Sequence, residues 1–158
     1  MGGLSFLLRS SGVAFTEVAV KHAGDPGGRA PLLRFAIIAG IALSLITILF
    51  AVYPLSGIWY RDIEGLPEEV LRLARNATWA MAPLPLFTFL TSYWQGVLVD
   101  AHRTRPVSEG VGVGLATISV VLVALAWADV IPGVVGASLA LSGGAAAQSI
   151  WLACRART

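Results

Sequence analysis

Charged residues and cysteine are both scarce in this sequence. Only 13% of its residues are charged and 56% are hydrophobic, whereas soluble domains carry roughly 25% charged residues. This deficit excludes an ordinary water-soluble globule. The single cysteine, Cys154, excludes an internal disulfide framework and a cysteine-rich metal centre. The two histidines, His22 and His102, are far apart and leave little material for a histidine-based metal site.

The signals of nucleic-acid binding and of catalysis are missing as well. The 11 lysines and arginines give a net charge of only +2 and are scattered between apolar stretches, so they form no basic face for a nucleic acid. The chain has no nucleophile elbow, phosphate-binding glycine loop, zinc-protease motif or usefully spaced carboxylate pair. We therefore expect no enzyme, no catalytic residues and no metal or other cofactor.

The sequence does contain long runs without charged residues. Residues 35–60, 76–99, 110–128 and 130–154 each contain no Asp, Glu, Lys or Arg. Each run approaches or exceeds the ~20 residues with which an α-helix crosses a bilayer. Because lipid offers no hydrogen bonds to the backbone, and because the runs do not alternate as barrel strands do, membrane-spanning helices are predicted.

A fifth candidate helix lies near the start of the sequence. Ser5, Arg9, Gly12 and Thr16 would share one face of a helix there, which suits a segment buried in a bundle or lining a cavity. An amphipathic helix lying in the membrane interface is the alternative. We therefore predict an all-α, polytopic membrane bundle, a single domain over 1–158 with about five transmembrane helices. These are expected at approximately 4–22, 35–57, 67–100, 107–128 and 131–154.

The basic residues predict an orientation. Seven of them lie in or beside the two loops after the first and third predicted helices and in the C-terminal segment, whereas three lie between residues 61 and 75, at the start of the third helix and in the loop before it. Basic loops stay in the cytoplasm, which places the C-terminus there in a cell (plasma or inner) membrane. Membrane lipids are the partners that this location implies.

Two features bear on helix shape and packing. Pro83 and Pro85 remove backbone donors within the third predicted helix and should kink it, either as a hinge or as a static bend held by neighbouring helices. Small residues recur every fourth position, which permits close helix packing. They are Gly110 and Gly114 in the fourth predicted helix, and Gly136, Ala140 and Gly144 in the last.

Two ionisable residues, Arg9 and Glu17, lie within residues 4–20 of the first predicted helix. Charged groups inside spans often mark proton or ion pathways, so Glu17 could be a proton-coupled carboxyl or a cation ligand. It could equally pair with Lys21 one turn later at the membrane interface. Arg9 could bind an anionic head group or phosphate, extend outward to the interface, or pair with another helix.

Three stretches carry a resemblance to a known family. They are Tyr-Trp-Gln-Gly-Val-Leu at 93–98, Arg-Thr-Arg-Pro-Val at 103–107 and Ile-Pro-Gly-Val-Val-Gly-Ala-Ser-Leu-Ala at 131–140. The pattern resembles the multidrug and oligosaccharidyl-lipid (MOP) flippase superfamily, which includes the MATE exporters, and most closely the bacterial relatives of the progressive ankylosis protein. The resemblance implies helices two to six of a six-helix repeat, that is, one transporter lobe without its first helix.

The implied function is transport by alternating access of lipid-linked, anionic or amphipathic substrates. The implied partner is a second transporter lobe or another copy of the chain. Transporter sites commonly lie near the midplane between repeats, so Arg9, Thr16, Glu17 and Gln95 are the candidate pathway residues, with the kink at Pro83 and Pro85. The alternative is a small multi-pass scaffold or accessory protein without transport activity of its own.

Overall fold

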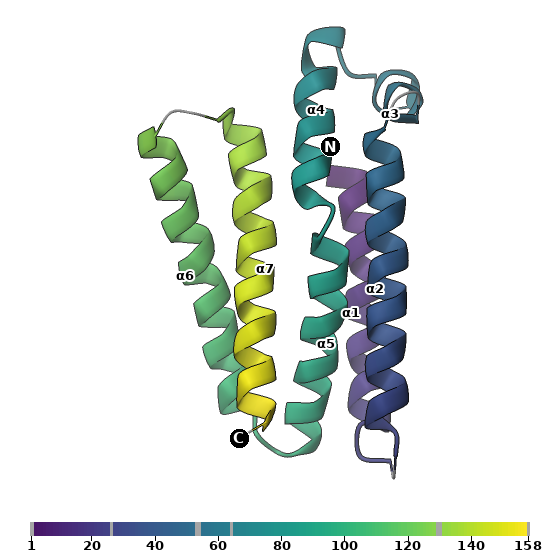
Figure 1. Cartoon of the computed structure of the whole chain (residues 1–158), viewed down its shortest axis with the longest axis vertical. Coiled ribbons are helices and arrows are strands. Elements are labelled where there is room, and N and C mark those ends of the chain that lie inside the picture. Colours follow the sequence, from purple (N-terminus) through teal and green to yellow (C-terminus); the bar gives the residue numbers. More distant parts are fainter. Residues whose placement is uncertain (1, 26, 53–54, 64, 129–130, 158) are drawn as a thin grey trace.

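The computed structural model is built of helices that run mostly along one long axis (Figure 1). It describes residues 2–25, 27–52, 55–63, 65–128 and 131–157, with the side chains of residues 2–9 left out. Every regular element in those ranges is helical. The helices are α1 (Gly2–His22), α2 (Arg29–Ala51), α3 (Leu55–Gly57), the π-helical η1 (Ile58–Ile63), α4 (Glu68–Met81), α5 (Leu84–Asp100), α6 (Arg105–Ala128) and α7 (Gly133–Arg157).

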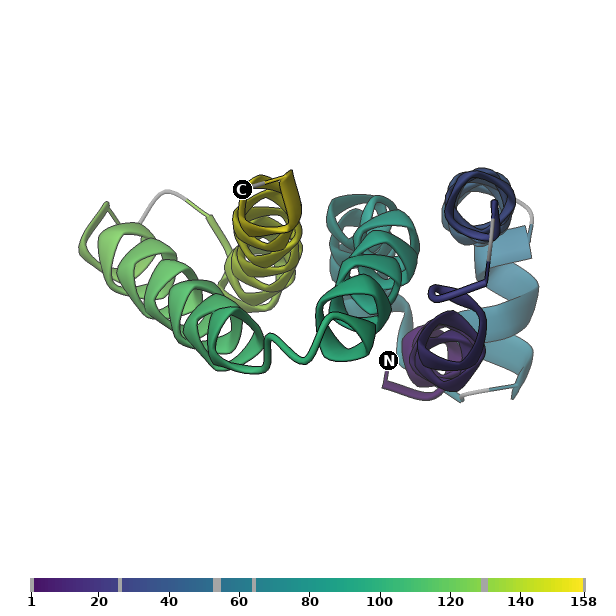
Figure 2. The ribbon, with the colours of Figure 1, turned by 90° about the horizontal axis from the view of Figure 1, so that it is seen from below.

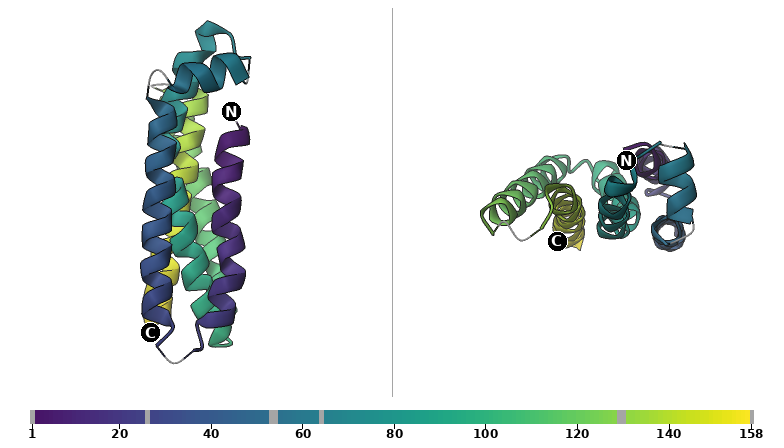
Figure 3. Two further views of the ribbon diagram at one scale, coloured as in Figure 1. Left: turned by 90° about the vertical axis from the view of Figure 1, so that its right-hand side faces the viewer. Right: turned by 90° about the horizontal axis from the view of Figure 1, so that it is seen from above.

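The helices form a row rather than a closed ring. Viewed along the bundle, α6 is followed by α7, then by α5, and then by the pair α1 and α2 (Figure 2). The views from the side and from above show the same narrow slab, with the short α3 and η1 segments lying across one end (Figure 3). α5 is therefore the central helix, and it packs against α1, α2 and α7.

Aromatic rings and small residues hold α1, α2 and α5 together. Phe15 of α1 is buried, and its ring lies 5.3 Å from that of Phe35 and 5.4 Å from that of Phe89. Nearer the loops, Gly96 of α5 lies directly against Ala19 of α1. A Cβ atom added at Gly96 would fall 2.6 Å from the Ala19 Cβ. Glycine is therefore what allows these two helices to approach so closely.

The predicted small-residue stripes lie at the interface of α6 with α7. A Cβ atom at Gly144 would lie 2.9 Å from the carbonyl oxygen of Gly114, and one at Gly110 would lie 2.9 Å from Leu152 Cδ2. Gly136 faces Leu125 further along the same interface, at 3.4 Å from such an added atom. Ala140 is fully buried. The stripes therefore lie where two backbones come close.

The predicted helix 67–100 is divided in the structure. α4 ends at Met81 and α5 begins at Leu84, with a turn at residues 82–83. Pro83 has no N–H to donate to the carbonyl of Trp79, which instead accepts from the N–H of Ala82 at 3.2 Å. The carbonyl of Ala80 accepts a hydrogen bond of 2.7 Å from Ser142 Oγ of α7. The two prolines thus produce a break rather than a bend, and a neighbouring helix satisfies one exposed carbonyl.

Helix ends differ from the predicted ones where charge was used to place them. α2 was expected over 35–57 but runs from Arg29 to Ala51. It begins earlier because a helix can continue past the bilayer, with Arg29 and Arg34 in water. The end of a charge-free run marks the edge of the bilayer and not the end of the helix. α2 ends earlier, three residues before Pro54, because the residue preceding a proline disfavours helical backbone.

Three helices in the described part of the chain are long and apolar enough to cross a membrane, namely α2, α6 and α7. Their surfaces are apolar: Ile38 of α2 is 68% exposed, Val120 of α6 67% and Ile150 of α7 62%. Side chains of this kind on the outside of a bundle favour lipid over water as the surrounding medium. The protein is accordingly a membrane protein with an all-helical fold.

Candidate ligand cavity

A cavity of 330 Å³ lies where α1, α5, α6 and α7 face one another. The cavity borders the break after Met81. Leu84, in the first turn of α5 after the break, forms part of the cavity wall. Gly114 and Gly144 form another part, so the close approach of α6 to α7 shapes the cavity. Gly114 lies nine residues into α6, which places this wall roughly 13 Å along the helix.

The lining combines six hydroxyl or amide side chains with aliphatic, Ala and Gly residues. The six polar residues are Thr16, Thr88, Thr91, Ser92, Gln95 and Gln148. Among the described residues, no Asp, Glu, Lys, Arg or His side chain forms part of the wall. The described part of the wall therefore offers hydrogen bonds but no fixed charge.

Two of the six polar groups are already used by the protein. Thr88 Oγ1 donates to the carbonyl of Leu84 at 2.9 Å, within α5. Ser92 Oγ donates to the carbonyl of Gly12 at 2.7 Å and so ties α5 to α1. These two hydroxyls stabilise the wall and have no donor left for a ligand.

The other four polar groups carry unused hydrogen-bonding capacity. Thr91 Oγ1 is buried and has no hydrogen-bond partner in the described part of the chain. The side chains of Thr16, Gln95 and Gln148 likewise make no hydrogen bond with described residues. Unpaired polar groups cost free energy in an apolar layer. A bound polar group, or water held in its place, would remove that cost.

The structure brings together two of the four candidate pathway residues. Thr16 of α1 and Gln95 of α5 line the same cavity. Glu17 points elsewhere: it is exposed and does not line the cavity. It also makes no ion pair with Lys21, or with any other described residue, in the structure. The side chain of Arg9 lies outside the described residues.

The kink residues contribute indirectly. Pro83 and Pro85 do not line the cavity, but Leu84 between them does. The hydrogen bond from Ser142 to Ala80 ties the break to α7. A neighbouring helix therefore contacts the break directly, and whether the break also acts as a hinge stays a prediction.

Sequence reasoning missed Thr91 and Gln148 as pathway residues. A signal for Thr91 was present: Thr88, Thr91, Ser92 and Gln95 follow one another at intervals of three, one and three, which places them on one face of a helix. Gln148 continues the face of Gly136, Ala140 and Gly144, which was interpreted as a packing stripe only. That α7 presents this face both to α6 and to a cavity is a consequence of tertiary packing.

No cluster of metal ligands accompanies the cavity. In the ranges that the structure describes, no three His, Cys, Asp or Glu side chains gather as they would around a metal ion. No protein-family model, curated protein or solved structure matches this chain.

Proposed function

We propose that this protein is a multi-pass transporter component that binds an amphipathic molecule in the cavity between α1, α5, α6 and α7. The observation that carries the proposal is the gathering of four unused polar side chains, those of Thr16, Thr91, Gln95 and Gln148, on the wall of one cavity. Such groups are costly in a purely structural protein. Their cost is offset when a ligand hydrogen-bonds to them.

The chemistry of the wall defines the class of ligand. With no charged group in the described lining, a fixed charge on the bound part of the ligand would lack a partner. Hydroxyl, amide or ether groups next to a hydrocarbon portion fit the mixture of donors, acceptors and aliphatic side chains. Among the lipid-linked, anionic and amphipathic substrates that the resemblance implies, the cavity favours an amphipathic molecule whose bound polar part is neutral.

We infer five membrane crossings in a cell membrane. α2, α6 and α7 satisfy the length and apolarity required. α5 has 17 residues, or roughly 26 Å, and the lower turns of α4 extend it across the remaining thickness. α1 runs antiparallel to α2 at the same depth (Figure 1). The end holding the loops after α1 and α5 and the end of α7 carries the seven basic residues, and the positive-inside rule puts it in the cytoplasm.

The proposal extends to the resemblance with the MOP flippase superfamily. The crossings α1, α2, α4 with α5, α6 and α7 correspond to helices two to six of that family's repeat. A lobe of this kind works opposite a second lobe, so a partner chain or a second copy completes the pathway. Alternating access then moves the ligand from the cytoplasmic to the outer side.

Translocation of a fluorescent lipid tests the function. The full chain would be reconstituted into liposomes containing NBD-labelled glucosylceramide, whose head group carries hydroxyls and no charge, and the fraction of probe protected from external dithionite would be followed over time. We expect the protein to accelerate exchange between leaflets, and Gln95→Leu with Gln148→Leu to abolish that acceleration. Thr117→Val is the matched control, because Thr117 bonds to Val113 of its own helix, away from the cavity.

The scaffold alternative is favoured by one observation. Glu17, the ionisable residue expected to serve a pathway, is exposed and does not line the cavity. A scaffold would leave lipid exchange at the rate of protein-free liposomes, and Gln95→Leu would then change nothing. Cross-linking in liposomes tests the need for a second copy: lipid exchange confined to cross-linked dimers supports transport by paired copies, whereas dimers without exchange contradict it.

A further inference from the structure

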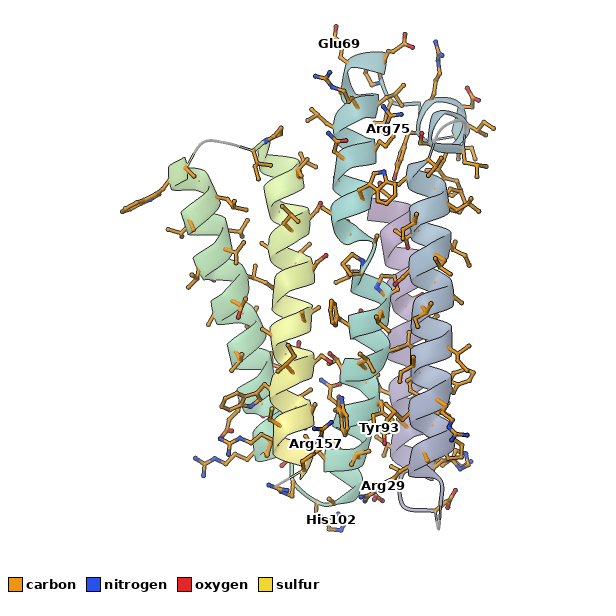
Figure 4. All side chains as sticks on the ribbon, viewed as in Figure 1. Arg29, Glu69, Arg75, Tyr93, His102 and Arg157 are labelled. Carbon is orange, nitrogen blue, oxygen red and sulfur yellow. The ribbon has the colours of Figure 1, made fainter. Side chains whose placement is uncertain are left out.

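A second cavity lies at the basic end of the bundle, apart from the one described above. It has a volume of 500 Å³ and is lined by residues 102–106, which cover the turn after α5 and the start of α6, and by Glu109 and Arg155. α5, α6 and α7 all reach this end of the molecule, where His102 and Arg157 are seen in Figure 4. Three arginines face one carboxylate around this space: Arg103, Arg105 and Arg155 against Glu109.

Glu109 positions two of these arginines. Its Oε1 accepts from Arg105 Nε at 3.0 Å, and its Oε2 accepts from Arg155 Nη2 at 3.2 Å. The Arg155 guanidinium also lies over the Trp151 ring, 4.8 Å from the ring centroid. A guanidinium has five N–H donors, and the Nε of Arg105 is the one that bonds to Glu109. Its two terminal nitrogens are therefore available to an incoming anion.

The turn after α5 brings the remaining cation to the cavity. His102 adopts a left-handed backbone conformation with φ of 57°. Its N–H bonds to the carbonyl of Val99 at 2.9 Å, and the N–H of Arg103 bonds to that of Leu98 at 2.8 Å. These two bonds form a Schellman motif, which reverses the chain at once. Arg103 is thereby held next to the first turn of α6 and makes no ion pair with any residue that the structure describes.

We propose that this cavity binds the phosphate group of an anionic membrane lipid. Arginine forks match the geometry of phosphate oxygens, and the start of α6 adds the positive end of a helix dipole. The cavity opens where the apolar surfaces of α6 and α7 meet the basic end, at the depth of lipid head groups. Basic pockets between membrane helices on the cytoplasmic side suit such head groups. The inference does not depend on the transport function.

Lipid retention by the purified chain tests the proposal. The protein would be extracted from liposomes containing equal amounts of phosphatidylglycerol and phosphatidylcholine, and the bound lipids counted by native mass spectrometry. We expect phosphatidylglycerol to be enriched. Arg103→Gln with Arg105→Gln should weaken its retention by about fivefold per arginine. Arg72→Gln with Arg75→Gln, which removes the same charge at the opposite end, is the matched control and should change nothing.

Two further measurements test the proposal even if the double glutamine variant folds poorly. Arg103→Lys with Arg105→Lys retains the charges and should keep the lipid bound. In the unaltered chain, retention of phosphatidylglycerol should fall as salt is added, since exposed charges are screened. Equal retention in all variants, equal loss in the control, or retention insensitive to salt would overturn the proposal. Displacement of the lipid by millimolar inorganic phosphate would assign the cavity to a soluble phosphate instead.

Discussion

Ser142 of α7 donates a hydrogen bond of 2.7 Å to the carbonyl of Ala80, 62 residues away in α4. The carbonyl lies next to the point where the two prolines interrupt the helix, between the end of α4 at Met81 and the start of α5 at Leu84. A polar side chain of α7 thus binds a backbone carbonyl whose donor in a continuous helix would be the N–H of Leu84. The break between α4 and α5 is held in place, and with it the wall of the ligand cavity that begins at Leu84.

Removing this hydroxyl should loosen the bundle. We expect Ser142→Ala to lower the free energy of unfolding by about 1 kcal/mol, as interhelical hydrogen bonds in membranes contribute. Ser138→Ala is the control. Ser138 is equally buried, at 5% exposure against 6% for Ser142, but bonds to Val134 of its own helix. Unfolding would be followed in mixed micelles by circular dichroism. Equal losses from the two variants would contradict the bracing role of Ser142.

Two adjacent glycines in α7 should respond in opposite ways to alanine. At Gly144 a Cβ atom would lie 2.9 Å from the Gly114 carbonyl oxygen, whereas at Gly143 it would meet nothing within 4 Å. Gly144→Ala should therefore destabilise the protein by about 1–3 kcal/mol. Gly143→Ala should leave stability unchanged or raise it by up to about 1 kcal/mol. Thermal unfolding in detergent measures both. A neutral Gly144→Ala would show that α6 and α7 separate without cost.

We expect the unpaired hydroxyl of Thr91 to lower the stability of the protein and to contribute to binding of the ligand. Thr91→Val keeps the shape of the side chain and removes the buried Oγ1, so we expect stability to rise by about 1 kcal/mol. Leaflet exchange of NBD-labelled glucosylceramide should slow in the same variant. Thr117→Val, whose hydroxyl is paired, should show neither effect. If Thr91→Val were instead destabilising, this hydroxyl would have a partner within the folded protein.

The left-handed residue after α5 should tolerate glycine better than histidine. His102 has φ of 57°, a conformation that glycine adopts without the steric cost of a Cβ atom. We expect His102→Gly to raise the unfolding free energy by about 0.5–1 kcal/mol. His102→Ala should bring no such gain, since alanine retains the Cβ. Melting curves of the two variants, recorded in one detergent, distinguish this conformational effect from loss of the imidazole.

The single cysteine reports orientation. Cys154 is exposed near the end of α7, at the basic end of the bundle. A membrane-impermeant maleimide should label Cys154 in inside-out membrane vesicles. It should not label Cys154 in spheroplasts, whose outer envelope has been removed but whose plasma membrane is intact. A Cys154→Ser chain carrying Glu69→Cys places the thiol at the other end (Figure 4) and should give the reverse pattern. Labelling of Cys154 in spheroplasts would show that the topology is the reverse of the one proposed.

The apolar character and order of the helices are properties of the sequence itself. Charge-free runs of helical length in a chain with 13% charged residues leave few alternatives to a membrane bundle. α6 and α7 were predicted within two or three residues at each end, because turns that contain Pro or charge bound them. The small-residue stripes were also evident, because a period of four residues places them on one helix face.

Other features were decided only by the tertiary structure. The prolines predicted a kink, but whether a carbonyl finds a partner depends on Ser142 arriving from α7. Thr16 and Gln95 were chosen individually, and their sharing one cavity with Thr91 and Gln148 depends on how four helices face one another. Glu17 was selected on its charge, yet the rotation of α1 leaves it exposed. The local sequence pattern determines which residues share one face of a helix, whereas packing against neighbouring helices determines the direction in which that face points.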